Sequence, residues 1–292
     1  MCDQRWPQSP HVFIHRVGVA VSSPPSARAS TPRRRLRRVG NWNILPSVLG
    51  GALSHAVADP QRLRRQLLKR AWIELKRFAA PHVTNIDVAS INGIDGVRVE
   101  GPVLRRSPLV LCALAALLDP ATIFEFGTYR GDTAWLLARN LPRARVYTLD
   151  LGGLDARYSA QLELTDIDEY FHEWDRGARF HGTPEGERIT QLVGDSATFD
   201  FAPYHGTIDL AYVDASHSYS YVKSDTEAAL AMLSPSGTII WDDYTHYSGI
   251  YAYLNELAPD LEHPIFHVLD TRLAVYSRRP ITNALESGLT RD

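Results

Sequence analysis

The sequence has little cysteine, no long apolar run and no excess of either charge. Its 292 residues include two cysteines, Cys2 and Cys112, which are too few for a disulfide framework or a cysteine zinc cluster. Cys112 lies in the run PLVLCALAALL and is expected to be a buried, inert thiol. No stretch reaches the roughly 18 apolar residues of a membrane span. A net charge of −2 predicts no bulk attraction to nucleic acid. We therefore expect a soluble, cytoplasmic protein without a membrane span or a nucleic-acid partner.

Acidic residues are missing from the N-terminal region. Between Gln4 and Ala58 there is no Asp or Glu, and arginines cluster in RRRLRR, from Arg33 to Arg38. This composition predicts a disordered basic extension over residues 1–58. An organelle transit peptide and an arm that touches nucleic acid are two other interpretations of the same composition. An extension with no role of its own is the simplest one.

The rest of the chain changes pattern near residue 101. Residues 59–100 are expected to form a helical or hairpin lead-in packed on the main domain, because Asp59-Pro60 is typical of a helix start. Residues 101–280 alternate between helical and strand patterns, and residues 281–292 form a tail. The strand-like runs are TIFEFG, ARVYTLDL, ITQLVGD, IDLAYVDA, GTIIWDDY, IFHVLD and LAVYSR. This alternation predicts an α/β fold, with a doubly wound and mostly parallel sheet. Its last strand is antiparallel, because only a tight turn joins it to the one before.

Residues 152–188 form a polar insertion that is longer than most connections. The insertion is rich in acidic and aromatic residues. At the carboxyl edge of a sheet, such a segment is a candidate substrate lid. A surface insertion without a functional role is an equally good interpretation.

A glycine loop follows the first strand of the alternating region. It reads Glu125-Phe126-Gly127-Thr128-Tyr129-Arg130-Gly131 and leads into a helix. Glycines at such a turn let the backbone approach a ligand closely. The spacing differs from the dinucleotide fingerprint G-x-G-x-x-G, which argues against an NAD-dependent oxidoreductase, and from the P-loop.

The next two strands end in acids suited to a nucleoside. Asp150 closes the second strand and can accept hydrogen bonds from both hydroxyls of a ribose. Asp195 and Ser196 follow the third strand and are well placed for an adenine edge. Any one of these features alone is weak, since turns often carry Gly and Asp. Together they indicate an adenosyl ligand.

With these motifs the chain resembles the class I S-adenosylmethionine-dependent methyltransferases, over roughly residues 100 to 279. The resemblance implies a seven-stranded sheet in the order 3-2-1-4-5-7-6. It also implies that S-adenosylmethionine is the cofactor. The cofactor-binding residues would be Glu125, Gly127, Thr128 and Gly131 in the first motif, Asp150 at the ribose, and Asp195 with Ser196 at the adenine.

Three carboxylates follow the fourth and fifth strands. Asp214 ends the fourth strand, and Asp242 and Asp243 end the fifth. Because the carboxyl ends of neighbouring parallel strands meet at one crevice, these acids would repel each other unless a cation lay between them. Oxygen ligands favour a hard ion such as Mg²⁺. The sequence therefore predicts a metal site at these three residues.

This arrangement resembles the divalent-metal O-methyltransferases that act on catechols, caffeoyl thioesters and macrolide sugars. In that subgroup a Lys or His stands three residues after the first acid, and here His217 does so. The resemblance implies metal-assisted methyl transfer to a hydroxyl of a small-molecule or sugar-like acceptor, with His217 as the base. Asp225, eleven residues after Asp214, is interpreted as structural.

Other interpretations of these residues remain open. Asp242 or Asp243 could cap a helix that begins near His246, and His217 could cap its own turn. Lys223 and His246 are alternative bases. The chain could also be a metal-independent methyltransferase acting on another nucleophile, or a non-catalytic adenosyl-binding or scaffold protein. A homo-oligomer is a further expectation.

Overall fold

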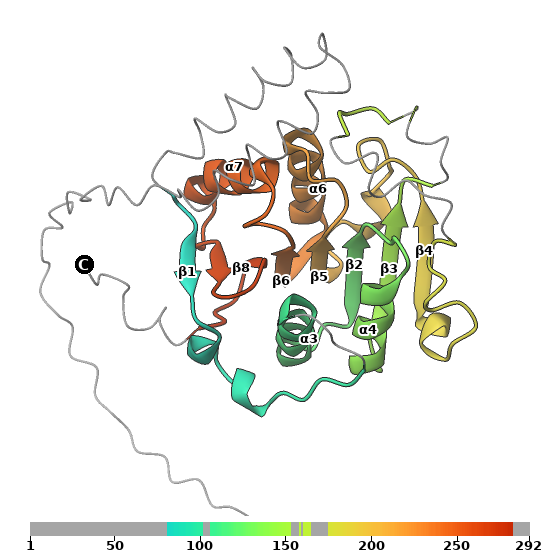
Figure 1. Ribbon diagram of the computed structural model, residues 1–292, viewed down its shortest axis with the longest axis horizontal. Helices are drawn as coiled ribbons and strands as arrows, with labels where there is room; N and C mark the ends of the chain where they lie inside the picture. Colours follow the sequence, from blue (N-terminus) through green and yellow to red (C-terminus); the bar gives the residue numbers. More distant parts are fainter. Residues whose placement is uncertain (1–80, 102–105, 153–157, 159, 165–174, 283–292) are drawn as a thin grey trace, which may run out of the picture. The chain divides into compact units, whose positions relative to one another are not determined.

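The computed structural model describes residues 81–101, 106–152, 158, 160–164 and 175–282 (Figure 1). The predicted basic extension, the helix predicted to start at Asp59 and nearly all of the tail lie outside the described residues, as does much of the insertion. Within the described part of the chain, no helix has the length and apolar character needed to cross a membrane.

One eight-stranded sheet organises the fold, in the order β1-β7-β8-β6-β5-β2-β3-β4. β8 is antiparallel to both of its neighbours, and the other pairs are parallel. The strands are β1 (Thr84–Ile86), β2 (Thr122–Phe126), β3 (Arg145–Asp150), β4 (Ile189–Val193), β5 (Ile208–Val213), β6 (Leu233–Trp241), β7 (Phe266–Val268) and β8 (Ala274–Ser277).

The predicted strand order is confirmed, but the predicted number of strands is wrong. β4-β3-β2-β5-β6-β8-β7 is the expected order 3-2-1-4-5-7-6, including the antiparallel last strand. The eighth strand, β1, pairs in parallel with the outer edge of β7, from Thr84 opposite Phe266 to Ile86 opposite Val268. Only Ile86 of β1 is buried, so the strand carries no alternating apolar pattern that a sequence could reveal.

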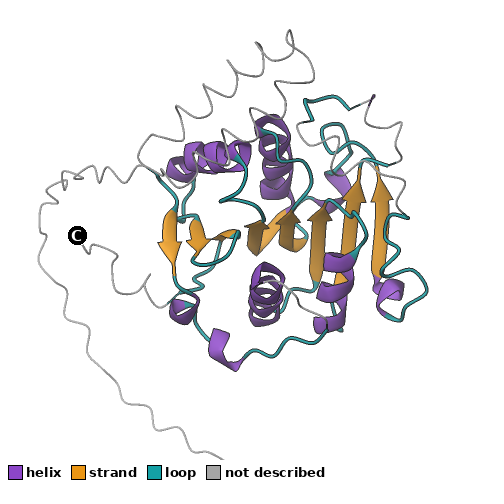
Figure 2. Ribbon diagram, in the orientation of Figure 1, coloured by secondary structure: helices purple, strands orange, loops and turns teal. Residues whose placement is uncertain are grey.

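Helices cover both faces of the sheet, as the alternating pattern predicts. α3 (Arg106–Leu118) and α4 (Asp132–Asn140) lie on one face, and α6 (Tyr219–Met232) and α7 (Ser248–Leu257) lie on the other (Figure 2). The described residues also include 3₁₀ turns: η2 (Val88–Ser90), η3 (Ile94–Gly96), η5 (Glu185–Arg188), η6 (Ala202–Tyr204) and η7 (Ala258–Asp260).

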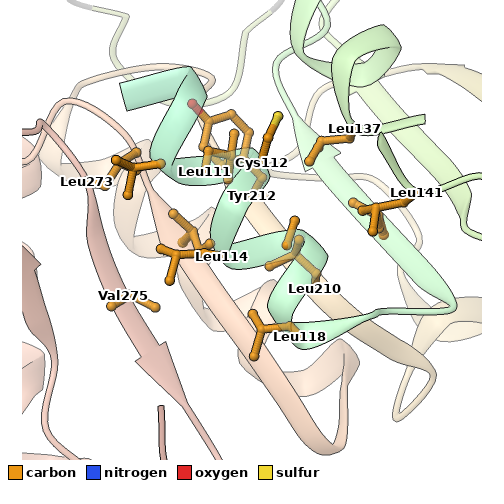
Figure 3. Packing of buried hydrophobic residues seen from close by; sticks show 14 of the residues in the cluster. Leu111, Cys112, Leu114, Leu118, Leu137, Leu141, Leu210, Tyr212, Leu273 and Val275 are labelled. Atoms are coloured by element: carbon orange, nitrogen blue, oxygen red, sulfur yellow. The ribbon is translucent and has the colours of Figure 1, made fainter. Parts of the chain in front are cut away.

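The sheet separates two apolar layers because successive strand residues point to opposite faces. On β5, Leu210 and Tyr212 face the layer beneath α3, whereas Ala211 and Val213 face the layer beneath α6 and α7. Figure 3 shows Leu210 and Tyr212 packed against α3. Cys112 is fully buried there, as predicted, and burial raises the pKa of its thiol to about 12.

Candidate functional site

A cavity of about 330 Å³ opens at the carboxyl ends of the parallel strands. This is the edge at which doubly wound sheets bind their ligands. The predicted site residues that line it are Gly127, Thr128, Asp150, Asp195, Ser196, Asp214, His217 and Asp243. Glu125, Gly131 and Asp242 are not among the described residues that line it. The structure thus brings most of the predicted residues together at one place.

The two glycines of the loop after β2 are required by packing. Gly127 has a φ of 96°, and a Cβ built on it would lie 2.2 Å from the backbone oxygen of Asp214. Gly131 has a φ of 82° at the N-cap of α4, and its Cβ would lie 2.6 Å from the ring of Phe180. Both conformations are ones that residues with a side chain seldom adopt. The glycines therefore let the loop fold tightly between β5 and the chain near Phe180.

Glu125 supports this loop from within the protein. Its side chain is buried and accepts a hydrogen bond of 2.5 Å from the hydroxyl of Thr148. The same hydroxyl lies 2.7 Å from that of Thr128 in the loop. Burial raises the pKa of the Glu125 carboxyl well above its ordinary value. Glu125 is thus linked to the cavity through two threonines rather than exposed in it.

Asp150 holds the glycine loop and also pairs with an arginine. Its Oδ2 accepts hydrogen bonds from the backbone N–H groups of Thr128 and Tyr129, at 3.2 and 2.9 Å. Its Oδ1 lies 2.7 Å from Nε of Arg176, which also lines the cavity. The carboxylate predicted to meet a ribose is therefore at the cavity wall, with a guanidinium beside it.

Asp195 is fixed by the neighbouring helix. The hydroxyl of Tyr221, on α6, lies 3.0 and 3.1 Å from the two carboxylate oxygens of Asp195. Backbone N–H groups of Gln161 and Ala197 also donate to Asp195. Ser196 follows it on the cavity wall. Several donors therefore fix the side chain predicted to lie near the adenine.

One arginine pairs with two of the three carboxylates that follow β5 and β6. Nη1 of Arg272 lies 2.6 Å from Oδ1 of Asp243, and Nη2 lies 3.2 Å from Oδ2 of Asp242. The hydroxyl of Tyr212 lies 3.1 Å from Asp242 and 3.3 Å from Asp214. The pKa of Asp214 is raised well above its ordinary value. Burial is the largest cause, and repulsion from Asp242 and from Asp243 adds to it. The cluster is therefore only partly neutralised by its own residues.

His217 is held against the same cluster. Its Nε2 lies 3.2 Å from Oδ2 of Asp243, and its ring stacks on that of Tyr247 at 3.9 Å and 6°. Burial alone would raise the pKa of Asp243, but the bond from His217 and the charges of His217 and Arg272 lower it. Asp243 has a φ of 57°, a left-handed conformation that Asp tolerates better than most residues. An ionised acid therefore fixes a buried imidazole, an arrangement suited to proton transfer.

A divalent cation fits part of the predicted metal set. Asp214, His217 and Asp243 each offer a ligand atom, and these atoms lie within 4.8 Å of one another. Asp242 is instead engaged by Tyr212, Arg272 and the backbone N–H of Asp243. The donors that converge are therefore two carboxylates and an imidazole, with His217 in the place predicted for Asp242.

The structure does not favour the capping interpretations. The N-cap of α7 is Tyr247, and that of α6 is Ser218, whose hydroxyl accepts a hydrogen bond from the N–H of Tyr221. Lys223 lies 3.8 Å from Glu227. Neither Lys223 nor His246 is among the described residues that line the cavity.

The described end of the insertion lies against the glycine loop. The N–H of Gly177 donates to the carbonyl of Tyr129, and that of Arg179 donates to the carbonyl of Arg130. Arg179 also lies 4.1 Å above the ring of Trp135 on α4. The predicted lid lies partly outside the described residues and stays a prediction.

Two arginines of the cavity wall, Arg176 and Arg272, were not predicted from the sequence. Arg176 lies in the polar insertion, where no pattern indicates its partner. Arg272 precedes β8, and β8 begins where the antiparallel strand β6 ends, because Ala274 is opposite Trp241. That topology could have placed Arg272 at the edge where Asp242 and Asp243 lie.

Part of the chain matches a known protein family, and the chain is similar to several solved structures. Residues 124–244 match a family model described as a methyltransferase domain. No curated protein matches the chain. It is similar to the solved structure of the O-methyltransferase TomG from Streptomyces achromogenes, in complex with SAM, at 18% identity and a TM-score of 0.40, covering 60% of this chain and 80% of that one. It is also similar to a methyltransferase from Geobacter sulfurreducens, at 16% identity and a TM-score of 0.45, covering 64% and 93%.

Proposed function

We propose that the chain is a class I S-adenosylmethionine-dependent O-methyltransferase acting on a hydroxyl of a small-molecule or sugar-like acceptor. The match of residues 124–244 to a methyltransferase domain supports this proposal. The observation that carries the proposal is the buried His217–Asp243 pair, which opens on the same cavity as Gly127, Asp150 and Asp195. A hydroxyl is a poor nucleophile until its proton is removed, so a base beside a donor site is what this reaction needs.

The residues at the β2, β3 and β4 ends would hold the methyl donor. Asp150 and Asp195 are carboxylates suited to the ribose and the adenine, and the backbone around Gly127 and Thr128 borders the same space. When bound, S-adenosylmethionine supplies an electrophilic methyl group on sulfur. The fixed loop geometry would keep that end of the cavity in one alignment relative to the acids, and alignment accounts for a large part of such rate enhancements.

His217 would take the proton of the acceptor hydroxyl. Its Nε2 lies 3.2 Å from Oδ2 of Asp243, which places the imidazole beside a carboxylate that can stabilise the added proton. Asp243 would hold the ring in one orientation and stabilise the imidazolium, as the acid does in other acid–histidine pairs. The stacked ring of Tyr247 limits tilting of the imidazole. Together these contacts would present a fixed base to the acceptor.

We further propose that a divalent ion, predicted from the sequence to be Mg²⁺, assists the methyl transfer. Asp214, Asp243 and His217 would hold it, and it would lower the pKa of a coordinated hydroxyl. An imidazole among the donors also suits Mn²⁺ or Zn²⁺. In this version His217 is a ligand. In the metal-free version His217 is the base, and the pairing of Arg272 with Asp242 and Asp243 favours that version.

Two measurements test the proposal. Isothermal titration with S-adenosylhomocysteine should show binding, and no binding at about millimolar ligand, the weak end of specific affinities, would remove it. A screen of hydroxylated acceptors with radiolabelled methyl donor should then find transfer to oxygen, whereas labelled nitrogen would contradict it. Treatment with EDTA followed by Mg²⁺ or Mn²⁺ separates the two versions: activity lost and then restored supports the metal, and unchanged activity supports the metal-free enzyme.

A further inference from the structure

Two hydrogen bonds anchor the backbone of Arg272. Its backbone N–H donates to the hydroxyl of Ser107 at 3.1 Å, and its carbonyl accepts from the N–H of Tyr244 at 2.9 Å. Ser107 lies in the first turn of α3, and Tyr244 follows the two acids after β6. The turn between β7 and β8 is thus tied to both elements, and the side chain of Arg272 extends from a fixed point to the cavity wall.

The guanidinium of Arg272 bridges two adjacent carboxylates. One terminal nitrogen lies 2.6 Å from Asp243, and the other lies 3.2 Å from Asp242. Both acid side chains are only 6% exposed. A planar guanidinium can span two oxygens in a way that an ammonium cannot. An ion that bridged Asp242 and Asp243 would have to displace this group, because both would compete for the same oxygens.

We infer that Arg272 is the built-in cation of the carboxylate cluster, occupying the position in which a divalent ion would otherwise bridge Asp242 and Asp243. Asp242 is therefore a ligand of Arg272 and not of a metal. Arg272 is a positioning residue: it holds Asp243 in the orientation that meets His217. The inference rests on the proposed function only for this catalytic consequence, since the charge arrangement itself does not depend on the acceptor.

Metal binding tests this assignment without any substrate. We expect Arg272→Gln to bind Mn²⁺ about tenfold or more tightly than the wild type in isothermal titration, because a positive charge leaves and two carboxylates are released. Asp242→Asn should leave wild-type Mn²⁺ binding within about threefold and should reduce the gain of Arg272→Gln, because only Asp243 is then released. Arg106→Gln is the matched control, because Arg106 pairs with Asp270 of the same turn at the surface. It should change nothing.

Two results would overturn the inference. One is an Mn²⁺ affinity of Arg272→Gln equal to that of the wild type, and the other is an Asp242→Asn variant that loses wild-type Mn²⁺ binding as fully as Asp214→Asn does. If Arg272→Gln does not fold, Arg272→Lys takes its place. Lysine keeps the charge but gives up the two-oxygen bridge, so Mn²⁺ affinity should rise about threefold, and an unchanged value contradicts the assignment.

Binding of S-adenosylhomocysteine separates this inference from the proposed function. The Arg272 variants should keep their affinity within about threefold, because Arg272 contacts the acids rather than Asp150 or Asp195. If no variant and no wild-type protein binds the ligand, the proposed function fails while the Mn²⁺ series still decides the role of Arg272. A purely structural Arg272 would lower thermal stability without creating a stronger metal site.

Discussion

The carboxyl group of Asp225, on α6, should make the stability of the protein depend on pH. The side chain is fully buried, and neither oxygen has a hydrogen bond of good geometry. Burial raises its pKa from the ordinary 3.8 to about 7, an effect that the hydroxyl of Ser196 offsets only in part. Replacing Asp225 with Asn mimics the neutral form and removes the titration.

The size and sign of this effect follow from proton linkage. A raised pKa in the folded protein means that folding favours the protonated acid, so this stabilisation is complete below pH 4 and is lost as the pH rises through about 7. A change from 3.8 to about 7 corresponds to about 4 kcal/mol, since one pKa unit is worth about 1.4 kcal/mol. About 2.5 kcal/mol of that falls between pH 5 and pH 8.

Urea denaturation at pH 5 and pH 8 provides the assay. The free energy of unfolding of Asp225→Asn, minus that of the wild type, should be more positive at pH 8 than at pH 5 by about 2.5 kcal/mol. Asp260→Asn, at an exposed acid, is the control and should show no such difference. A pH-dependent difference below about 0.5 kcal/mol would refute the reasoning, because it would mean that Asp225 ionises in the fold as easily as in the unfolded chain.

Three further predictions concern the cavity and the core. Asp150→Asn should weaken S-adenosylhomocysteine binding about tenfold or more, because hydrogen bonds to a charged group are lost; unchanged titration curves would exclude Asp150 from the ribose site. His217→Gln should lower methyl transfer about 100-fold or more, on any acceptor found by the screen, while ligand affinity stays within about threefold; equal turnover would exclude His217 as base or ligand. Leu114→Ala should cost about 2–5 kcal/mol of unfolding free energy, because Leu114 is fully buried on the core-facing side of α3; a loss under about 1 kcal/mol in urea would contradict this burial.

Much of the fold could be predicted because its strands are apolar, separated by helical patterns and ended by recognisable turns. The positions of the loop from Gly127 to Gly131 and of the acids after β3, β4, β5 and β6 could be predicted in the same way, because each follows a recognisable strand. β1 could not be predicted, because only one of its three residues is buried and the strand therefore shows no alternation of apolar and polar residues. The strand owes its place to the free edge of β7, which is a tertiary property.

The finer contacts of the candidate site depend on geometry that a sequence does not express. Asp242 and Asp243 are adjacent and chemically identical, yet Asp243, which has a φ of 57°, lies 3.2 Å from His217, whereas Asp242 is engaged by Tyr212 and Arg272. Arg176 and Arg272 reach the cavity from segments distant in sequence from Asp150 and Asp243. The sequence pattern does not indicate where the charged end of a long side chain lies. Such partners can therefore be identified only in the folded structure.

Gly127, in the loop after β2, and the carbonyl of Asp214, in the loop after β5, approach each other closely at the wall of the cavity. With no room for even a methyl group between them, the spacing from the β2 loop to the β5 loop is set by van der Waals contact and not by loop flexibility. Neither loop can therefore move closer to the other without pushing it. A substitution that adds a side chain at residue 127 will therefore also displace the loop after β5, and both loops have to be redesigned together.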